Sequence, residues 1–176
     1  MTQRTDTNPQ VIDILLKRNG YFPNNELPVL IYKKAFHLPR QKNKAAEIIQ
    51  HIFLRNGWSN SWKNGIYDFH HYHSTTHECL GIAMGGAMVI IGGPGGKRIK
   101  FTAGDLIIIP AGVGHKCISQ TEDFCCVGAY PQGKEFDINT GSVEEYKKAV
   151  LKIRKLNVPR YDPLSGKEGA LRVYWK

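Results

Sequence analysis

Four side chains near the middle of the chain have the types and the spacing to bind one metal ion. They are His71, His73, Glu78 and His115. Residues two apart on a strand point to the same side, so His71 and His73 can reach one cation if residues 66–73 form a strand. Imidazoles and a carboxylate that leave coordination positions open suit iron, manganese, nickel, copper or zinc. These residues therefore predict a site for one divalent transition metal ion.

The strand predicted over residues 66–73 is rich in aromatic residues, which favour an extended chain. By the alternation of a strand, Tyr67 and Phe69 share a face with the two histidines, whereas His70 faces the other way. We therefore expect Tyr67 and Phe69 to line the metal pocket.

A second strand is predicted over residues 78–84, after a turn. Glu78 then shares a face with Leu80 and Met84, and the two apolar residues become candidates for the pocket wall. If Glu78 faces inward, it is both a metal ligand and a candidate catalytic base. His77 faces away in this register, but a shift of one residue would make it an alternative ligand.

The fourth ligand needs a separate part of the chain. Residues 106–109 are apolar and predict a short strand, and residues 110–114 predict a tight corner, because proline fixes φ and glycine allows positive φ. In the strand that follows, His115, Cys117 and Ser119 share one face. We expect Cys117 and Ser119 to line the pocket beside the fourth ligand.

These residues resemble the two signature motifs of the cupin family. The first motif is glycine, five residues, His-x-His, three or four residues, glutamate, six residues and glycine, and it is met here by Gly65, His71, His73, Glu78 and Gly85. The second is glycine, five residues, Pro-x-Gly, two residues, histidine, three residues and asparagine, and it is met by Gly104, Pro110, Gly112 and His115, with Ser119 in place of asparagine. Since the last position is not usually a ligand, this departure leaves metal binding unaffected. Residues 70–78 and 110–116 also resemble one group of stand-alone bacterial cupins that has no firmly assigned reaction.

The resemblance implies a mainly β fold. This is a single antiparallel jelly-roll β-barrel of the cupin type, with a few flanking α-helices and a metal inside. Many short apolar segments with turns between them favour the same class. We expect one domain overall, with an N-terminal arm over residues 1–64, the barrel core over 65–141 and a C-terminal part over 142–176.

The parts outside the barrel core carry helix and strand signals. Periodic apolar residues predict a helix over 43–56, and a capping box at 142–145 predicts the start of another. Residues 9–17 suit a short helix or a strand, and residues 29–32 predict a strand. The alternation from Leu171 to Trp175 predicts a strand at a sheet edge.

The composition limits the cellular setting and the partners. The polar N-terminus and the absence of a long apolar run predict a cytoplasmic protein that does not bind membranes. The four cysteines follow no zinc or disulfide spacing, so we expect free thiols.

The net charge is +9, yet residues 66–141 carry −2 and the flanks +11. This basic excess is read as solvated helix surface, since no nucleic-acid-binding motif accompanies it. Cupins of this size often pair through edge strands and terminal arms, so the resemblance implies a homodimer.

Three functions fit these observations. The leading hypothesis is a mononuclear metalloenzyme that uses three histidines and one glutamate on a small-molecule substrate. Iron would give dioxygenase-like chemistry, and manganese, nickel or zinc would give Lewis-acid isomerisation or hydrolysis. The second is a non-catalytic metal or small-molecule binder or sensor. The third is a metal-free sugar epimerase, which needs a His–Asp base instead of the four ligand types present here.

Overall fold

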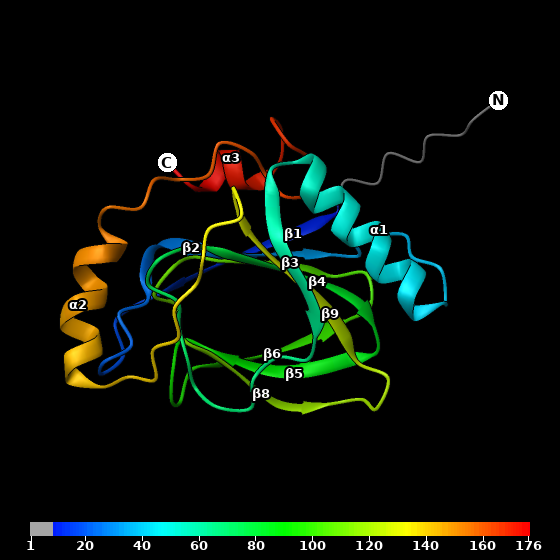
Figure 1. Ribbon diagram of the computed structural model, residues 1–176. Coiled ribbons are helices and arrows are strands. Elements are labelled where there is room, and N and C mark those ends of the chain that lie inside the picture. The colour runs from blue at the N-terminus through cyan, green and yellow to red at the C-terminus, as the bar shows by residue number, and fades with distance from the viewer. Residues whose placement is uncertain (1–8) are drawn as a thin grey trace.

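Two antiparallel sheets face each other and enclose an apolar interior (Figure 1). The computed structural model describes residues 9–176, so the polar N-terminus on which part of the cytoplasmic prediction depends lies outside the described residues. The larger sheet has the order β1 (Gln10–Leu16), β2 (Asn25–Lys33), β7 (Leu106–Ile109), β4 (Glu78–Met84), β9 (Cys125–Pro131) and β3 (Trp58–Asn64). The smaller sheet has the order β6 (Lys97–Thr102), β5 (Gly86–Ile91) and β8 (His115–Gln120). The predicted mainly β jelly roll with a few flanking helices is confirmed.

The central strands of the larger sheet are buried on both faces because their alternate residues enter two different cores. On β2, Val29 and Ile31 enter the core between the sheets, whereas Leu30 and Tyr32 enter a second core on the outer face. Each such side chain contributes about 1.5–3 kcal/mol when it leaves water. The outer core is covered by α1 (Lys42–Arg55) and α3 (Ala170–Tyr174), which lie above this sheet in Figure 1.

The two longer helices follow the sequence signals closely. In α1, Ala45, Ile49 and Phe53 are spaced four apart, and all three are fully buried against the sheet. The second helix, α2 (Val143–Ile153), begins at a complete capping box, in which Glu145 N donates to Ser142 Oγ over 3.2 Å. Both helix predictions are confirmed.

The prediction of a C-terminal strand over 171–175 is wrong, because this segment forms α3. Only Leu171 and Trp175 are buried, and Val173 between them is 62% exposed. A spacing of four is helical, so the alternating apolar sequence was misleading. The segment is held by Trp175 Nε1, which donates to Pro28 O over 2.8 Å, and by Leu171 N, which donates to Asp162 Oδ2 over 3.2 Å.

The prediction of a strand over 66–73 is also wrong. The strand in this region is β3, which ends at Asn64 and pairs with β9, and the chain then continues without regular structure to a bridge at His71 and Tyr72. The sequence of β3 is rich in serine, asparagine and lysine, which gave it no strand signal. Its position at the edge of the sheet, with half of its residues facing solvent, explains that composition.

No helix among residues 9–176 is long and apolar enough to cross a membrane.

The corner between β7 and β8 depends on a glycine. Gly112 has φ +88°, and a Cβ there would lie 2.6 Å from Asn24 O. Gly95 also has a positive φ of +72°, but a Cβ there would meet nothing within 4 Å. Gly95→Ala should therefore cost only the backbone strain, about 1 kcal/mol of unfolding free energy.

Gly112→Ala adds a clash with backbone to the same strain, so we predict a loss of about 3 kcal/mol. Urea denaturation followed by circular dichroism measures both variants. Equal losses in the two variants would show that the corner is not close-packed.

Candidate metal centre

The segment that carries His71 and His73 is fixed by backbone hydrogen bonds to the corner before β8. His71 N donates to His115 O over 3.2 Å, and His115 N donates to His71 O over 2.9 Å. Gly112 N donates to His73 O over 2.7 Å. The two halves of the sequence pattern, about forty residues apart, are thereby brought together, as the spacing of the motifs predicts.

Each of the three histidines has one ring nitrogen bound to a backbone carbonyl. Nδ1 lies 3.0 Å from Phe69 O in His71, 2.5 Å from Asp137 O in His73 and 3.0 Å from Val113 O in His115. A carbonyl only accepts hydrogen bonds, so Nδ1 must carry the proton and Nε2 presents a lone pair in the neutral ring. The ligand nitrogens of all three buried rings lie within 4.8 Å of one another.

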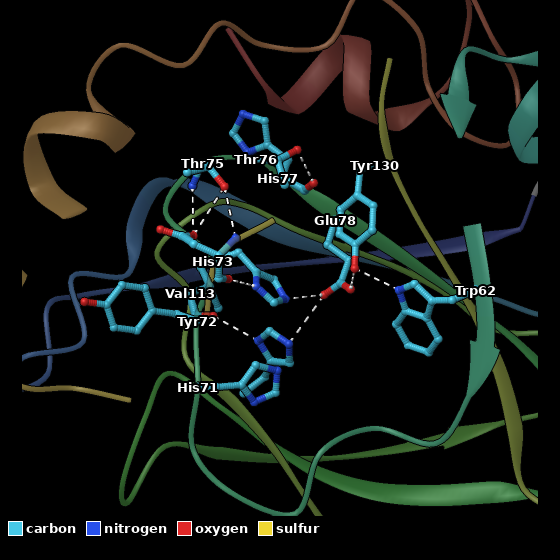
Figure 2. A network of polar contacts seen from close by, with 12 residues as sticks. Trp62, His71, Tyr72, His73, Thr75, Thr76, His77, Glu78, Val113 and Tyr130 are labelled. Carbon is cyan, nitrogen blue, oxygen red and sulfur yellow. Dashed lines mark hydrogen bonds and ion pairs between the residues drawn. The ribbon is translucent and has the colours of Figure 1, made fainter. Parts of the chain in front are cut away.

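Glu78, the first residue of β4, extends into the same space (Figure 2). Its Oε2 lies 3.4 Å from Nε2 of His73 and 3.5 Å from Nε2 of His115. Within the described part of the chain, this buried oxygen has no hydrogen-bond partner. A buried anionic oxygen that faces nitrogen lone pairs needs a positive charge between them. The donor set therefore fits a divalent cation.

The electrostatics of the centre follow from burial and from the proximity of the four groups. Burial, together with His115, lowers the pKa of His71 to about 3. Burial also disfavours charge on His73, but Glu78 outweighs it and raises the pKa of this imidazole. The pKa of Glu78 lies well below its usual value, because His73 and His115 outweigh its complete burial. A proton on His73 and a metal cation would therefore compete for the same place beside Glu78.

Asp137 fixes the chain on the far side of His73. Its carboxylate accepts hydrogen bonds from Ser74 N over 2.6 Å and Ser74 Oγ over 2.5 Å, and from Lys152 Nζ over 3.2 Å. Its backbone carbonyl holds Nδ1 of His73. One residue thus anchors both the imidazole and the turn that follows it.

A cavity of about 340 Å³ opens beside the four groups. All four line it, together with apolar and aromatic side chains from β3, β4, β9 and the connecting segments, namely Trp62, Ile66, Tyr67, Leu80, Tyr130 and Phe136. The lining also includes the side chain of one lysine, Lys63, besides the carboxylate of Glu78. Small-molecule sites commonly combine a mostly apolar wall with a few convergent polar groups.

The predicted alternative ligand His77 lies apart from this centre. It is buried, its Nδ1 accepts from Ala111 N over 3.0 Å, and its ring lies 4.9 Å from the ring of Trp175. Burial lowers its pKa to about 4. Because Glu78 points inward, its neighbour His77 points towards the outer core, as the alternation of a strand requires.

The pocket wall predicted from strand alternation needs correction at four positions. Tyr67 and Leu80 line the cavity, but Phe69, Met84, Cys117 and Ser119 do not. Phe69 does not lie in a strand, so the alternation of a strand does not apply to it. Its ring stacks on the ring of Tyr67 with the centroids 4.9 Å apart, and 40% of its surface is exposed.

Irregular strand pairing explains why Met84 and Ser119 do not line the cavity. A bulge between Ile82 and Met84 turns Met84 towards the outer core. A second irregularity, where Met88 pairs with Ser119 and Val89 with Cys117, leaves Ser119 exposed. Cys117 does face the interior, but it packs in the core between the sheets. All four cysteines are buried and free, as predicted.

Three residues of the centre were not predicted from the sequence. Tyr130 donates to Glu78 Oε1 over 3.1 Å, Phe136 stacks on Tyr130 at 5.0 Å, and Asp137 anchors His73. Tyr130 belongs to β9, and which face of the sheet it occupies depends on how β9 pairs with β4. Phe136 and Asp137 belong to a loop with no sequence signal.

No family model matches the chain. The "uncharacterized protein YjlB" of Bacillus subtilis (strain 168) is 39% identical over 158 residues, which cover 89% of this chain and 92% of that protein. The alignment covers nearly the whole of both chains. The chain belongs to the same family as YjlB, and its sequence carries the two motifs that resemble those of the cupin family.

Solved structures resemble this chain at low identity and with TM-scores below 0.5. Acireductone dioxygenase from Bacillus anthracis, which has a cadmium ion in its active centre, is 20% identical with a TM-score of 0.43, covering 61% of this chain and 80% of that chain. RmlC from Streptococcus suis is 13% identical with a TM-score of 0.35, covering 79% and 75%. Likeness at this level says nothing about the reaction of this protein.

The anchoring by Asp137 gives a pH-dependent prediction. The hydrogen bonds from Ser74 and the contact with Lys152 outweigh partial burial and lower the pKa of Asp137. A lowered pKa stabilises the folded state above the unfolded value of 3.8, and this stability is lost as the pH falls towards the folded value. Asp137→Ala should therefore cost about 2 kcal/mol of unfolding free energy at pH 7 and progressively less below about pH 4.

Urea denaturation at pH 7 and at pH 3 measures this difference. Glu135→Ala is the matched control, because Glu135 is exposed and its carboxylate makes none of these contacts. A loss for Asp137→Ala that is the same at both pH values would contradict the role assigned to the carboxylate.

Proposed function

We propose that this protein is a mononuclear metal-dependent cupin enzyme that acts on a small molecule. His71, His73, His115 and Glu78 hold the ion. The observation that carries the proposal is the orientation of the donors. Backbone carbonyls occupy Nδ1 of all three imidazoles, and Nε2 of His73 and His115 faces the unpartnered Oε2 of Glu78. A bound divalent ion would polarise an oxygen of the substrate and make it more acidic.

The residues of the cavity support an enzyme more than a closed binding site. The four donors lie on the wall of a cavity of about 340 Å³, which gives a small molecule room beside the ion. Trp62, Tyr67 and Phe136 offer flat apolar surfaces, and Lys63 offers a positive charge for an oxyanion. The same donors would serve the alternative function, a non-catalytic metal or small-molecule binder or sensor.

The class of reaction depends on the metal. Iron would favour a dioxygenase-like reaction, and manganese, nickel or zinc would favour Lewis-acid isomerisation or hydrolysis. Glu78 would serve as a ligand and, through a carboxylate oxygen that does not contact the ion, as a base. We also propose that the protein is cytoplasmic and works as a homodimer without a nucleic-acid partner.

The proposal predicts stabilisation by metal. At a free metal concentration of 100 times Kd, binding adds about 2.7 kcal/mol to the unfolding free energy. For a chain of this length this amounts to a rise in Tm of about 5–10 °C. Thermal denaturation with manganese, iron(II), nickel, copper or zinc should show such a rise for at least one ion, and a chelator should reverse it.

His115→Ala should abolish the rise, and His37→Ala, which changes an exposed histidine outside the motifs, should keep it. No rise with any of the five ions would contradict the metal site. If the wild type is stabilised, binding of azide to the cobalt(II) form then distinguishes the two functions. A change in its absorption spectrum indicates an open position, as an enzyme needs, and an unchanged spectrum favours a closed binding site.

A further inference from the structure

The hydroxyl group of Tyr130 lies between Glu78 and the indole of Trp62 (Figure 2). It donates a hydrogen bond to Glu78 Oε1 over 3.1 Å and accepts one from Trp62 Nε1 over 2.8 Å. Tyr130 belongs to β9 and Trp62 to β3, two strands that pair directly. Both hydrogen-bond partners of this hydroxyl, Trp62 and Glu78, therefore come from strands that pair with β9.

The two oxygens of Glu78 consequently have different surroundings. Oε1 receives the hydrogen bond from Tyr130, whereas Oε2 faces Nε2 of His73 and of His115 without a hydrogen bond among the described residues. A carboxylate can bind a metal ion through one oxygen or through both. The hydrogen bond to Oε1 favours the first of these modes, because it turns one oxygen away from the imidazoles.

The place of the Trp62 ring is fixed by a glycine of β9. A Cβ on Gly128 would lie 2.2 Å from Trp62 Cε2. Any side chain larger than that of glycine at this position would therefore collide with the indole ring. Gly128 pairs with Trp62 across the two strands. Close packing of this kind sets the direction of the Nε1–H bond towards Tyr130.

We propose that Tyr130, oriented by Trp62, is a positioning residue that makes Glu78 bind its metal through Oε2 alone. The inference rests on the proposed metal site and adds how one of its ligands is set. An oxygen kept away from the ion leaves a coordination position free. Tyr130 and Trp62 also line the cavity, so the free position would face the space available to a small molecule.

Tyr130→Phe tests this proposal, because it removes the donor and keeps the ring. The matched control is Tyr72→Phe, since Tyr72 is also fully buried and its hydroxyl has no hydrogen-bond partner among residues 9–176. Manganese(II) is the probe, with affinity measured from the electron paramagnetic resonance signal of the free ion. The number of bound water molecules is measured from water-proton relaxation.

In Tyr130→Phe, Oε1 becomes free to bind the ion and displace water. We expect the number of bound waters to fall by about half and the affinity to change by about tenfold, as is common when a partner of a metal ligand is removed. Trp62→Phe, which frees the hydroxyl to rotate, should give an intermediate water number. Tyr72→Phe should match the wild type.

The outcomes separate the two claims. If the wild type binds manganese and Tyr130→Phe keeps both its water number and its affinity, the positioning role is overturned and the metal site stands. If Tyr130→Phe and Tyr72→Phe change both quantities equally, the effect comes from general loosening and the role is again overturned. If the wild type binds neither manganese nor any other divalent ion, both the metal site and the positioning role are overturned.

Discussion

The structure depends on one buried negative charge and on the positive charge that must accompany it. Glu78 is buried at the start of the central strand β4, and three imidazoles whose protons point outward surround the same space. An isolated carboxylate in such a place costs several kcal/mol. A proton on His73 offsets part of that cost, and a divalent cation offsets more because it meets the carboxylate and the nitrogen lone pairs together.

The fold supplies this arrangement through its connections more than through its strands. Of the four groups, Glu78 and His115 begin β4 and β8, whereas His71 and His73 lie in an irregular segment. That segment is held by backbone bonds to the corner at Gly112 and by Asp137 from the loop after β9. The two apolar cores on either side of the larger sheet make the strands rigid, so that loops anchored to them hold the imidazoles in place.

Much of the site could be predicted from the sequence because its residues follow fixed spacings. His71, His73 and His115 come together as the two motifs predict, although residues 66–73 do not form the predicted strand. The convergence of the three histidines therefore does not depend on that strand. The pocket wall was less predictable, since one bulge is enough to move Met84 or Ser119 to another face. Contacts such as Tyr130 to Glu78 depend on which strands pair, and Asp137 depends on the path of a loop. Neither is encoded in a local pattern.

Anomalous X-ray diffraction from crystals of the wild-type protein grown with manganese, with data collected on both sides of the metal absorption edge, would show directly whether these four side chains hold an ion. We predict one anomalous peak per chain, in contact with Nε2 of His71, His73 and His115 and with Oε2 of Glu78. A peak elsewhere on the chain, or metal-saturated crystals with no peak between these four residues, would contradict this prediction.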